Sequence, residues 1–247
     1  GRAVLNRDDP YCGDFLDAAR GRVAAEPLTY GVDTAADLRA EHIDATPSGT
    51  TFALSHGDER TRVKLGLLGA YNVYNALAAL GIGLALGLSP EEAVSGVESL
   101  DSVPGRFETV DAGQDFTAAV DYAHTPDALE HHLTAARDLR PNRVIAVFGC
   151  GGDRDRGKRP IMGRIGATLS DVAIITSDNP RTEDPDAIIR DVEAGAPTES
   201  NARAIADRGE AIAAAVAEAR AGDIVLIAGK GHEDYQILAS RRIDFDD

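Results

Sequence analysis

The second half of the chain repeats one pattern that leaves few choices of fold: a fully apolar run followed by a helical stretch. From about residue 107, the runs FTAAVDY, RVIAVFG, DVAIITS and DIVLIAG alternate with segments of helical spacing. Strands that are apolar along their whole length are typical of a parallel sheet covered by helices on both faces. We therefore predict an α/β fold. Its expected helices cover about 126–139, 158–169 and 185–194, and the segment GEAIAAAVAEA.

The first hundred residues read differently. They open on the strand-like run RAVLNRDDP, and residues 28–65 break into short strand-like pieces separated by glycine and polar turns. The segment AYNVYNALAALGIGLALGL then has helical spacing. Ser89 and Pro90 predict the start of a further helix that closes near Leu100, since serine caps helices and proline suits the first helical position.

Charge and composition exclude several classes of partner. The formal net charge is −16, which disfavours nucleic acid and anionic membranes as partners. The sequence shows no apolar run of membrane-spanning length and no signal segment, so we expect a soluble cytoplasmic protein. Cys12 and Cys150 form no CxxC motif, and we expect buried thiols and no metal site.

Polar residues follow four of the predicted strands. In a parallel sheet, ligands bind beyond the carboxyl ends of the strands. The candidate positions are residues 121–124, 149–159, 178–181 and 229–233. Each has a simpler structural interpretation, such as a glycine turn, a solvated charge run or a capping aspartate. Together at one sheet edge, they predict a site for a polar, multiply charged ligand.

The residue types at these positions suggest the ligand. Arg154 and Arg181 carry the planar fork that binds a carboxylate through two parallel hydrogen bonds. Asp178, Asn179 and Glu233 offer oxygen acceptors for an ammonium group. A cavity with both sets would recognise an amino acid zwitterion.

Longer motifs point to a family. The segments GAYNVYNALAAL, VPGRFE, VDYAHTPDALE, VFGCGGDRDRGKRPIMG, SDNPRTEDP and AGKGHEDYQI occur in this order. Together they resemble the Mur ligases, and within them the MurE branch, the UDP-N-acetylmuramoyl-tripeptide synthetases of the meso-diaminopimelate-adding type. The resemblance covers essentially the whole chain and is strongest from residue 69 onward. It implies that residues 1–106 are the C-terminal part of a central ATPase domain, and that residues 107–247 form a Rossmann-like C-terminal ligase domain.

The resemblance also implies a reaction. These enzymes add an amino acid to UDP-N-acetylmuramoyl-L-alanyl-D-glutamate during peptidoglycan precursor synthesis. ATP phosphorylates the glutamate side-chain carboxylate, and the incoming amine attacks the acyl phosphate. ATP and Mg²⁺ are the implied cofactors, with the magnesium ligands in an upstream part of the enzyme. We expect small-molecule substrates only and a monomeric protein.

Site residues carry over position by position. Asn72 and Asn75 match an asparagine pair near the nucleotide, and His124 lies beside it. Arg106 matches a hinge arginine that meets phosphates, and Asp121 matches an aspartate that holds the ribose; these two are the implied catalytic residues. The amino-acid pocket is implied to contain Arg154, Asp178, Asn179, Pro180, Arg181, Gly229 and Glu233. Arg181, after Asn-Pro, marks members that select meso-diaminopimelate, because it can hold the distal carboxylate.

One departure from the family is large. The chain contains no GxxxxGK[ST] phosphate loop, and the family's magnesium-binding glutamate and histidine and its carbamylated lysine have no counterpart. We therefore expect an incomplete part of a ligase that is inactive alone. Two alternatives stay open: a non-catalytic truncated paralogue that binds an amino acid or nucleotide, and a Mur-type ligase that adds a different amino acid.

Overall fold

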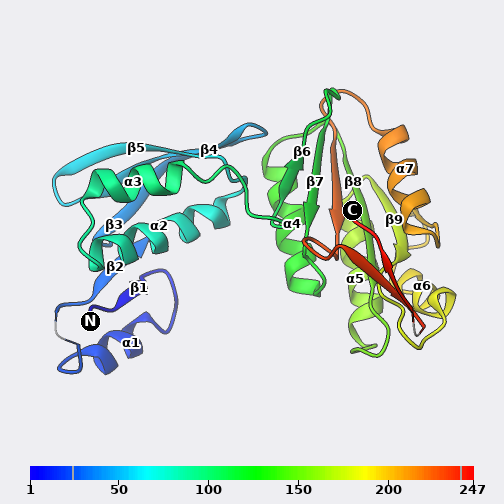
Figure 1. Ribbon diagram of the computed structural model, residues 1–247, viewed down its shortest axis with the longest axis horizontal. Helices are drawn as coiled ribbons and strands as arrows, with labels where there is room; N and C mark the ends of the chain where they lie inside the picture. Colours follow the sequence, from blue (N-terminus) through cyan, green and yellow to red (C-terminus); the bar gives the residue numbers. More distant parts are fainter. Residues whose placement is uncertain (24, 240) are drawn as a thin grey trace. The chain divides into compact units, whose positions relative to one another are not determined.

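The computed structural model describes residues 1–23, 25–239 and 241–247. The chain divides into two compact units, Gly1–Asp101 and Ser102–Asp247 (Figure 1). The domain boundary expected from the sequence, after Arg106, lies a few residues further along and stays a prediction. Each unit is described by itself.

The first unit is a five-stranded sheet with helices packed against it. The sheet order is β1-β2-β3-β4-β5; the pairs β1–β2 and β2–β3 are parallel, and β3, β4 and β5 form an antiparallel meander. Its elements are β1 (Val4–Asn6), α1 (Cys12–Ala19), β2 (Leu28–Gly31), β3 (Leu38–Thr46), β4 (Gly49–His56), β5 (Glu59–Leu65), α2 (Ala70–Ala85) and α3 (Pro90–Glu98).

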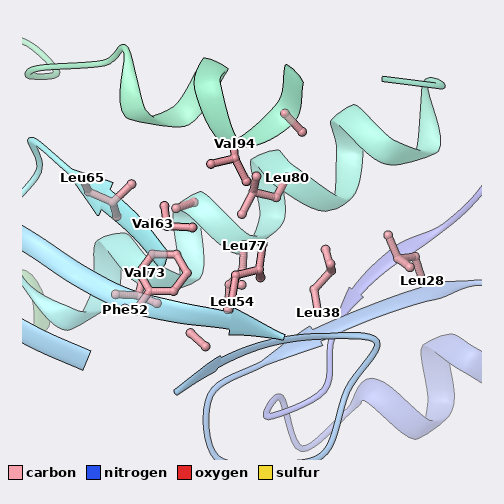
Figure 2. Close-up of a cluster of buried hydrophobic side chains, with 13 residues drawn as sticks. Leu28, Leu38, Phe52, Leu54, Val63, Leu65, Val73, Leu77, Leu80 and Val94 are labelled. Atoms are coloured by element: carbon pink, nitrogen blue, oxygen red, sulfur yellow. The ribbon is translucent and has the colours of Figure 1, made fainter. Parts of the chain in front are cut away.

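The core of this unit lies between the sheet and α2. Figure 2 shows Phe52 and Leu54 of β4 facing Val73 and Leu77 of α2, and all four side chains are buried. The predicted start of α3 is confirmed: Ser89 and Glu92 exchange the two hydrogen bonds of a capping box. Contiguous burial of this kind is the main favourable contribution to folding of the unit.

The second unit is built on a six-stranded sheet in the order β10-β9-β8-β11-β7-β6. All pairs are parallel except β6–β7. The predicted parallel α/β arrangement is therefore confirmed. Its elements are β6 (Glu108–Val110), β7 (Thr117–Asp121), α4 (Pro126–Asp138), β8 (Val144–Cys150), α5 (Lys158–Leu169), β9 (Val172–Ser177), α6 (Pro185–Glu193), β10 (Ala202–Ala204), α7 (Arg208–Glu218), β11 (Ile224–Ala228), β12 (Tyr235–Leu238) and β13 (Arg241–Asp244).

Helices cover both faces of this sheet. Ala211 and Ala215 of α7 pack with Ile145 and Val147 of β8 in one buried cluster. Helices α4, α5 and α6 pack side by side against the sheet as a second set (Figure 1). Strand β8 is buried at every residue, as expected for a strand between two helical layers. At Gly166 of α5, an added Cβ would lie 2.2 Å from the ring of Phe148, so glycine permits the close approach of α5 to β8.

The parallel order brings four carboxyl ends to one edge. Strands β9, β8, β11 and β7 are neighbours, and each ends where one of the polar motifs begins. Register confirms the alignment: Cys150 pairs with Ser177, and Ala228 pairs with Asp121. The motif residues that are far apart in sequence are thereby gathered at one edge of the sheet.

Candidate amino-acid-binding site

A cavity of about 810 Å³ opens at this edge, entirely within the second unit. Most of the residues predicted for the amino-acid pocket line it, together with one residue predicted for the nucleotide: His124, Arg154, Asp178, Asn179, Arg181, Gly229 and Glu233. The four strand ends therefore do converge. The cavity is large enough for a small polar metabolite.

Arg181 is held by the loops that follow β8 and β9. One guanidinium nitrogen, Nη1, donates to the carbonyl oxygen of Gly152 at 2.9 Å, and more weakly to that of Asn179 at 3.4 Å. The backbone of Arg181 has φ 53°, in the left-handed region that costs energy for a residue with a Cβ. A Cβ at Gly151 would lie 2.8 Å from the same guanidinium nitrogen, so glycine there leaves the space that Arg181 fills.

Asp153 also holds the loop that contains Arg181 through hydrogen bonds. Its φ is also 53°, and its carboxylate accepts a hydrogen bond of 2.8 Å from the hydroxyl of Thr182. Its backbone N–H donates to Glu183 at 2.6 Å. Pro180 is buried, and its carbonyl oxygen accepts from the backbone N–H of Glu183 at 3.1 Å. Two left-handed residues in loops that are tied together by hydrogen bonds are typical of a pre-organised binding site.

The acidic side of the cavity is also tied together. The Asn179 side-chain amide donates to Glu233 at 2.9 Å, and its oxygen accepts from the backbone N–H of Ile237 at 2.8 Å. The Asp178 oxygen Oδ1 accepts no hydrogen bond within the described part of the chain, although its carboxyl group lines the cavity. An acceptor of this kind is suited to a ligand N–H.

Arg154 is held by fewer hydrogen bonds than Arg181. It is exposed, and Nη1 donates only to the carbonyl oxygen of the neighbouring Asp153, at 3.0 Å, among the hydrogen bonds described. Arg181 is thus fixed by neighbouring loops, whereas the Arg154 side chain reaches the cavity from a solvated position. Both present a guanidinium group to the same space.

The nucleotide candidates of the second unit gather around Tyr122. The guanidinium carbon of Arg106 lies 5.0 Å from the centre of the Tyr122 ring, and the ring centre of His124 is 4.5 Å from it. His124 Nδ1 lies 2.8 Å from the carbonyl oxygen of Tyr122, and Lys158 donates to the His124 carbonyl oxygen at 2.7 Å. Together they make a patch of aromatic rings with a cation at its edge.

Asp121 does not reach the surface. Its side chain is 0% exposed and accepts hydrogen bonds of 2.7 Å from the backbone N–H groups of both Phe107 and Ala123. His132 Nδ1 lies 3.1 Å from the same carboxylate. The carboxylate therefore joins the segment that contains Arg106 to the segment that contains His124.

Asn72 and Asn75 belong to the first unit, on helix α2. Asn72 donates to the carbonyl oxygen of Leu68 at 2.7 Å, and Asn75 donates to the Asn72 side-chain oxygen at 3.0 Å. The pair thus forms one connected group at the start of the helix. Its role with the nucleotide stays a prediction.

Three cavity residues had no individual role predicted from the sequence. Tyr122 and Lys158 lie within the predicted ranges 121–124 and 149–159, whereas Tyr235 lies outside all four ranges. Lys158 sits at the first position of α5 and reads as a solvated charge, and Tyr235 comes from a hairpin, β12–β13, that the sequence did not reveal. Tyr122 was detectable, because it lies between two residues that were predicted.

Candidate metal ligands and the two cysteines were located in the described part of the chain. Over residues 1–23, 25–239 and 241–247, no group of three or more histidine, cysteine, aspartate or glutamate side chains could hold a metal ion. Both cysteines are buried, and burial raises the pKa of the Cys150 thiol to about 11, so it stays protonated at neutral pH. None of the helices in the described part has both the length and the apolar character needed to cross a membrane.

Comparison with known proteins assigns the chain to a family. The family model described as Mur ligase, glutamate ligase domain, matches residues 105–231, about half of the chain, and the Mur ligase middle domain matches residues 1–83. The chain belongs to the Mur ligase family. The resemblance in the motifs and the Rossmann-like, mostly parallel fold of the second unit agree with this membership.

Individual Mur ligases are similar along the whole chain. Two relatives named UDP-N-acetylmuramoyl-L-alanyl-D-glutamate--2,6-diaminopimelate ligase, from Solibacter usitatus and Geobacillus kaustophilus, are 50% and 49% identical over 246 residues. These alignments cover 99% of this chain but 49% and 50% of the relatives. The chain therefore spans about half the length of the curated relatives it matches.

Solved structures agree. A structure of UDP-N-acetylmuramoyl-L-alanyl-D-glutamate--2,6-diaminopimelate ligase has a TM-score of 0.72 and 40% identity, and covers 99% of this chain and 51% of that chain. MurF from Acinetobacter baumannii shares the fold at 21% identity, with a TM-score of 0.69, over 93% of this chain and 48% of its own.

Proposed function

We propose that this chain forms part of an ATP-dependent ligase that adds meso-2,6-diaminopimelate to UDP-N-acetylmuramoyl-L-alanyl-D-glutamate. Support comes from the relatives that carry this activity in their names and are similar over 99% of the chain. The proposal includes a cytoplasmic location, small-molecule partners and a monomeric enzyme.

The observation that carries the proposal is the two-sided character of the cavity. Arg154 and Arg181 bring guanidinium groups to it, while Asp178, Asn179 and Glu233 bring oxygen acceptors. Arginine binds carboxylates through two parallel hydrogen bonds, and carboxylate or amide oxygens accept from an ammonium group. A diamino diacid presents both groups at each end. Arg181, fixed by two loops, is the proposed clamp on the carboxylate remote from the reacting amine.

In the proposed reaction, the main role of these cavity residues is to position the amine of the ligand. Phosphoryl transfer from ATP to the glutamate carboxylate gives an acyl phosphate and ADP. The diaminopimelate ammonium group first transfers a proton to solvent water, and the neutral amine attacks the acyl carbon. The C–N bond forms, the C–O bond to phosphate breaks, the amide nitrogen loses its second proton to solvent, and inorganic phosphate leaves. The acceptor side of the cavity holds the ammonium form and orients it, and orientation of two reactants can lower such a barrier by roughly 7–11 kcal/mol.

For the nucleotide, we infer roles for Asn72, Asn75, Arg106, Asp121 and His124. The exposed guanidinium of Arg106 suits a phosphate, and the Tyr122–His124 rings suit an aromatic base. Asp121 is inferred to act by holding the backbone on either side of this patch. We infer Mg²⁺ as the cofactor that accompanies ATP, and no residue of this chain is assigned to it.

A binding experiment on the 247-residue chain tests the proposal. Isothermal titration calorimetry, backed by NMR shift mapping, would compare meso-diaminopimelate with L-lysine and with glutamate. We expect meso-diaminopimelate to bind and L-lysine, which lacks the distal carboxylate, to bind much more weakly. Lysine binding as tightly as diaminopimelate would contradict the specificity, and absence of amino-acid binding at millimolar ligand would contradict the site.

A further inference from the structure

Lys230 is a fully buried lysine at the carboxyl end of β11, next to the cavity wall. It lies between Gly229 and Gly231, whose φ values are +129° and +53°. At residue 231, a Cβ would come within 2.7 Å of the Tyr122 Cβ, so the turn after Lys230 requires glycine. The two glycines thus allow the backbone turn that places the Lys230 side chain in the interior. An isolated lysine is almost never fully buried without partners.

Three oxygen atoms surround its ammonium group. The Lys230 nitrogen lies 3.5 Å from the Asn179 side-chain oxygen, 3.7 Å from Asp178 Oδ1 and 3.8 Å from Glu233 Oε2. All three partners line the cavity. One buried cation therefore contacts all three acceptor residues of the cavity, which come from the loops that follow β9 and β11.

Lys230 and the Ile237 N–H together fix the orientation of the Asn179 side-chain amide. The Asn179 oxygen accepts from the Ile237 N–H at 2.8 Å and faces Lys230, which leaves its nitrogen to donate to Glu233 at 2.9 Å. A flipped amide would point its NH₂ group at two donors. Asn179 is therefore held in one orientation, and it holds Glu233 in turn.

Charge counting gives this cluster one excess negative charge. A second buried cation, Arg208, pairs with Asp247 through two hydrogen bonds of 2.5 Å. Arg208 and Asp247 neutralise each other, so Lys230 remains to be shared by Asp178 and Glu233. Burial lowers the pKa of Lys230, while the carboxylates of Asp178 and Glu233 act in the opposite direction. Two carboxylates sharing one cation carry a net charge of about −1 toward the cavity, which matches one ligand ammonium group.

We propose that Lys230 is a positioning residue for ligand amine binding: its ammonium group sets the geometry of Asp178, Asn179 and Glu233. The inference rests on the proposed function for the identity of the ligand, but not for the internal arrangement of the cluster. The groups that face this ammonium are Asp178, Asn179, Glu233 and Tyr235, with Arg208 and Asp247 further away.

The test compares Lys230→Met with Lys64→Met in the full chain. Lys64 is exposed on β5 of the first unit and does not line the cavity. Binding of meso-diaminopimelate would be measured by calorimetry at pH 7. We expect Lys230→Met to lose about tenfold in affinity, because Asp178, Asn179 and Glu233 lose the cation that fixes their positions. Lys64→Met should bind as the unmodified chain does.

A second measurement separates this inference from the proposed function. At pH 7 without ligand, the NMR signals of the Asn179 side-chain amide and of the Asp178 and Glu233 carboxyl carbons should change in Lys230→Met and stay in place in Lys64→Met. If the unmodified chain binds no diaminopimelate but these signals change, the function fails and the role of Lys230 stands. Unchanged signals together with an unchanged affinity would overturn the role. If Lys230→Met does not fold, the double variant with Glu233→Gln, which restores charge balance, should fold, and a double variant no more stable than the single one would also overturn it.

Discussion

The guanidinium group of Arg181 donates a 2.9 Å hydrogen bond to the carbonyl oxygen of Gly152, and so joins the loops that follow strands β9 and β8. The same side chain lines the cavity. Its backbone sits at φ 53° and donates its N–H to the carbonyl oxygen of Ile237 at 3.1 Å. The arginine is thus placed before any ligand arrives, which reduces the entropy lost on binding.

Replacing Arg181 by asparagine should weaken diaminopimelate binding without unfolding the chain. Asparagine tolerates the left-handed backbone better than most residues, so the change removes the guanidinium group with little added strain. Hydrogen bonds to charged groups contribute about 1.5–3 kcal/mol each, which corresponds to roughly 10- to 100-fold in affinity. Calorimetry measures the change. The matched control is Arg156→Ala, an exposed arginine paired with Asp191, which should bind as the unmodified chain does. Equal losses in both variants would remove Arg181 from the site.

Asp121→Asn should destabilise the second unit. The buried carboxylate accepts from two backbone N–H groups, of Phe107 and Ala123, and asparagine would turn an NH₂ group toward one of them. An unsatisfied buried group costs about 1–3 kcal/mol of unfolding free energy. Guanidinium chloride unfolding, followed by circular dichroism, gives the difference. Asp138→Asn, at an exposed position near the end of α4, is the control. A stability equal to that of the control would show that Asp121 does not hold this junction.

Arg159 links acid stability to the binding loop. Its fully buried guanidinium group pairs with Glu183 at 2.7 Å and with Asp191 at 2.9 Å. Hydrogen bonds from Arg159 lower the pKa of both carboxyl groups. A carboxyl group with a lowered folded-state pKa adds stability above its unfolded pKa, and this stability is lost as pH falls through the folded value. The melting temperature should therefore decrease as the pH is lowered below about 4.

Arg159→Met should change the shape of that curve. The variant should melt at a lower temperature at pH 7, since a buried partner of two acids is removed, and its melting temperature should decline less between pH 5 and pH 3. Differential scanning calorimetry over pH 3–7 makes the comparison, with Arg156→Met as the control at the exposed rim of the same network. Parallel curves for Arg159→Met and the unmodified chain would show that the pairing does not govern acid stability.

The fold of the second unit was largely predictable because its central strands are apolar throughout. The expected helix over 158–169 coincides with α5, and the expected strand RVIAVFG contains most of β8. Elements with weaker patterns were missed. Helix α1 has no side-chain cap, and β10 is only three residues, Ala202–Ala204, with no apolar repeat. Such short elements are set by their neighbours, since local propensity alone is too weak to define them.

The site was predictable where a rule linked sequence to position. Because parallel strands end at one edge, the sequence alone predicts that Asp178, Arg181 and Glu233 lie together. The contacts within the site were not predictable. A lysine at a strand end reads as a solvated charge, and only the flanking glycines hint that Lys230 is buried. The complete burial of Asp121 also depends on backbone donors from residues 107 and 123, which no motif encodes.

Tyr74→Phe should destabilise the first unit through Asp8. The Asp8 carboxylate accepts from the backbone N–H groups of Val32, Asp33 and Thr34 and from the Tyr74 hydroxyl, at 3.0 Å. Burial raises the pKa of the Asp8 carboxyl, but the hydrogen bonds from residues 32–34 outweigh it and hold that pKa well below its usual range. Burial and the bond to Asp8 raise the pKa of Tyr74 to about 12. The phenol's contribution is therefore present below pH 10 and is lost as pH rises through about 12.

At pH 7, removal of the hydroxyl should cost about 1–2 kcal/mol of unfolding free energy, since the bond reaches a charged group. Denaturant unfolding of Tyr74→Phe measures this cost, and Tyr11→Phe, at a tyrosine that is 65% exposed, should show none. Repeating the measurement toward pH 11 checks the sign: the difference in unfolding free energy between the two proteins should be constant below about pH 9 and should narrow from about pH 10 upward, as the phenol ionises in the unfolded chain but stays protonated in the folded one. A difference that does not change up to pH 11 would mean that the folded chain leaves the pKa of Tyr74 at its ordinary value, and that Asp8 is held by the backbone alone.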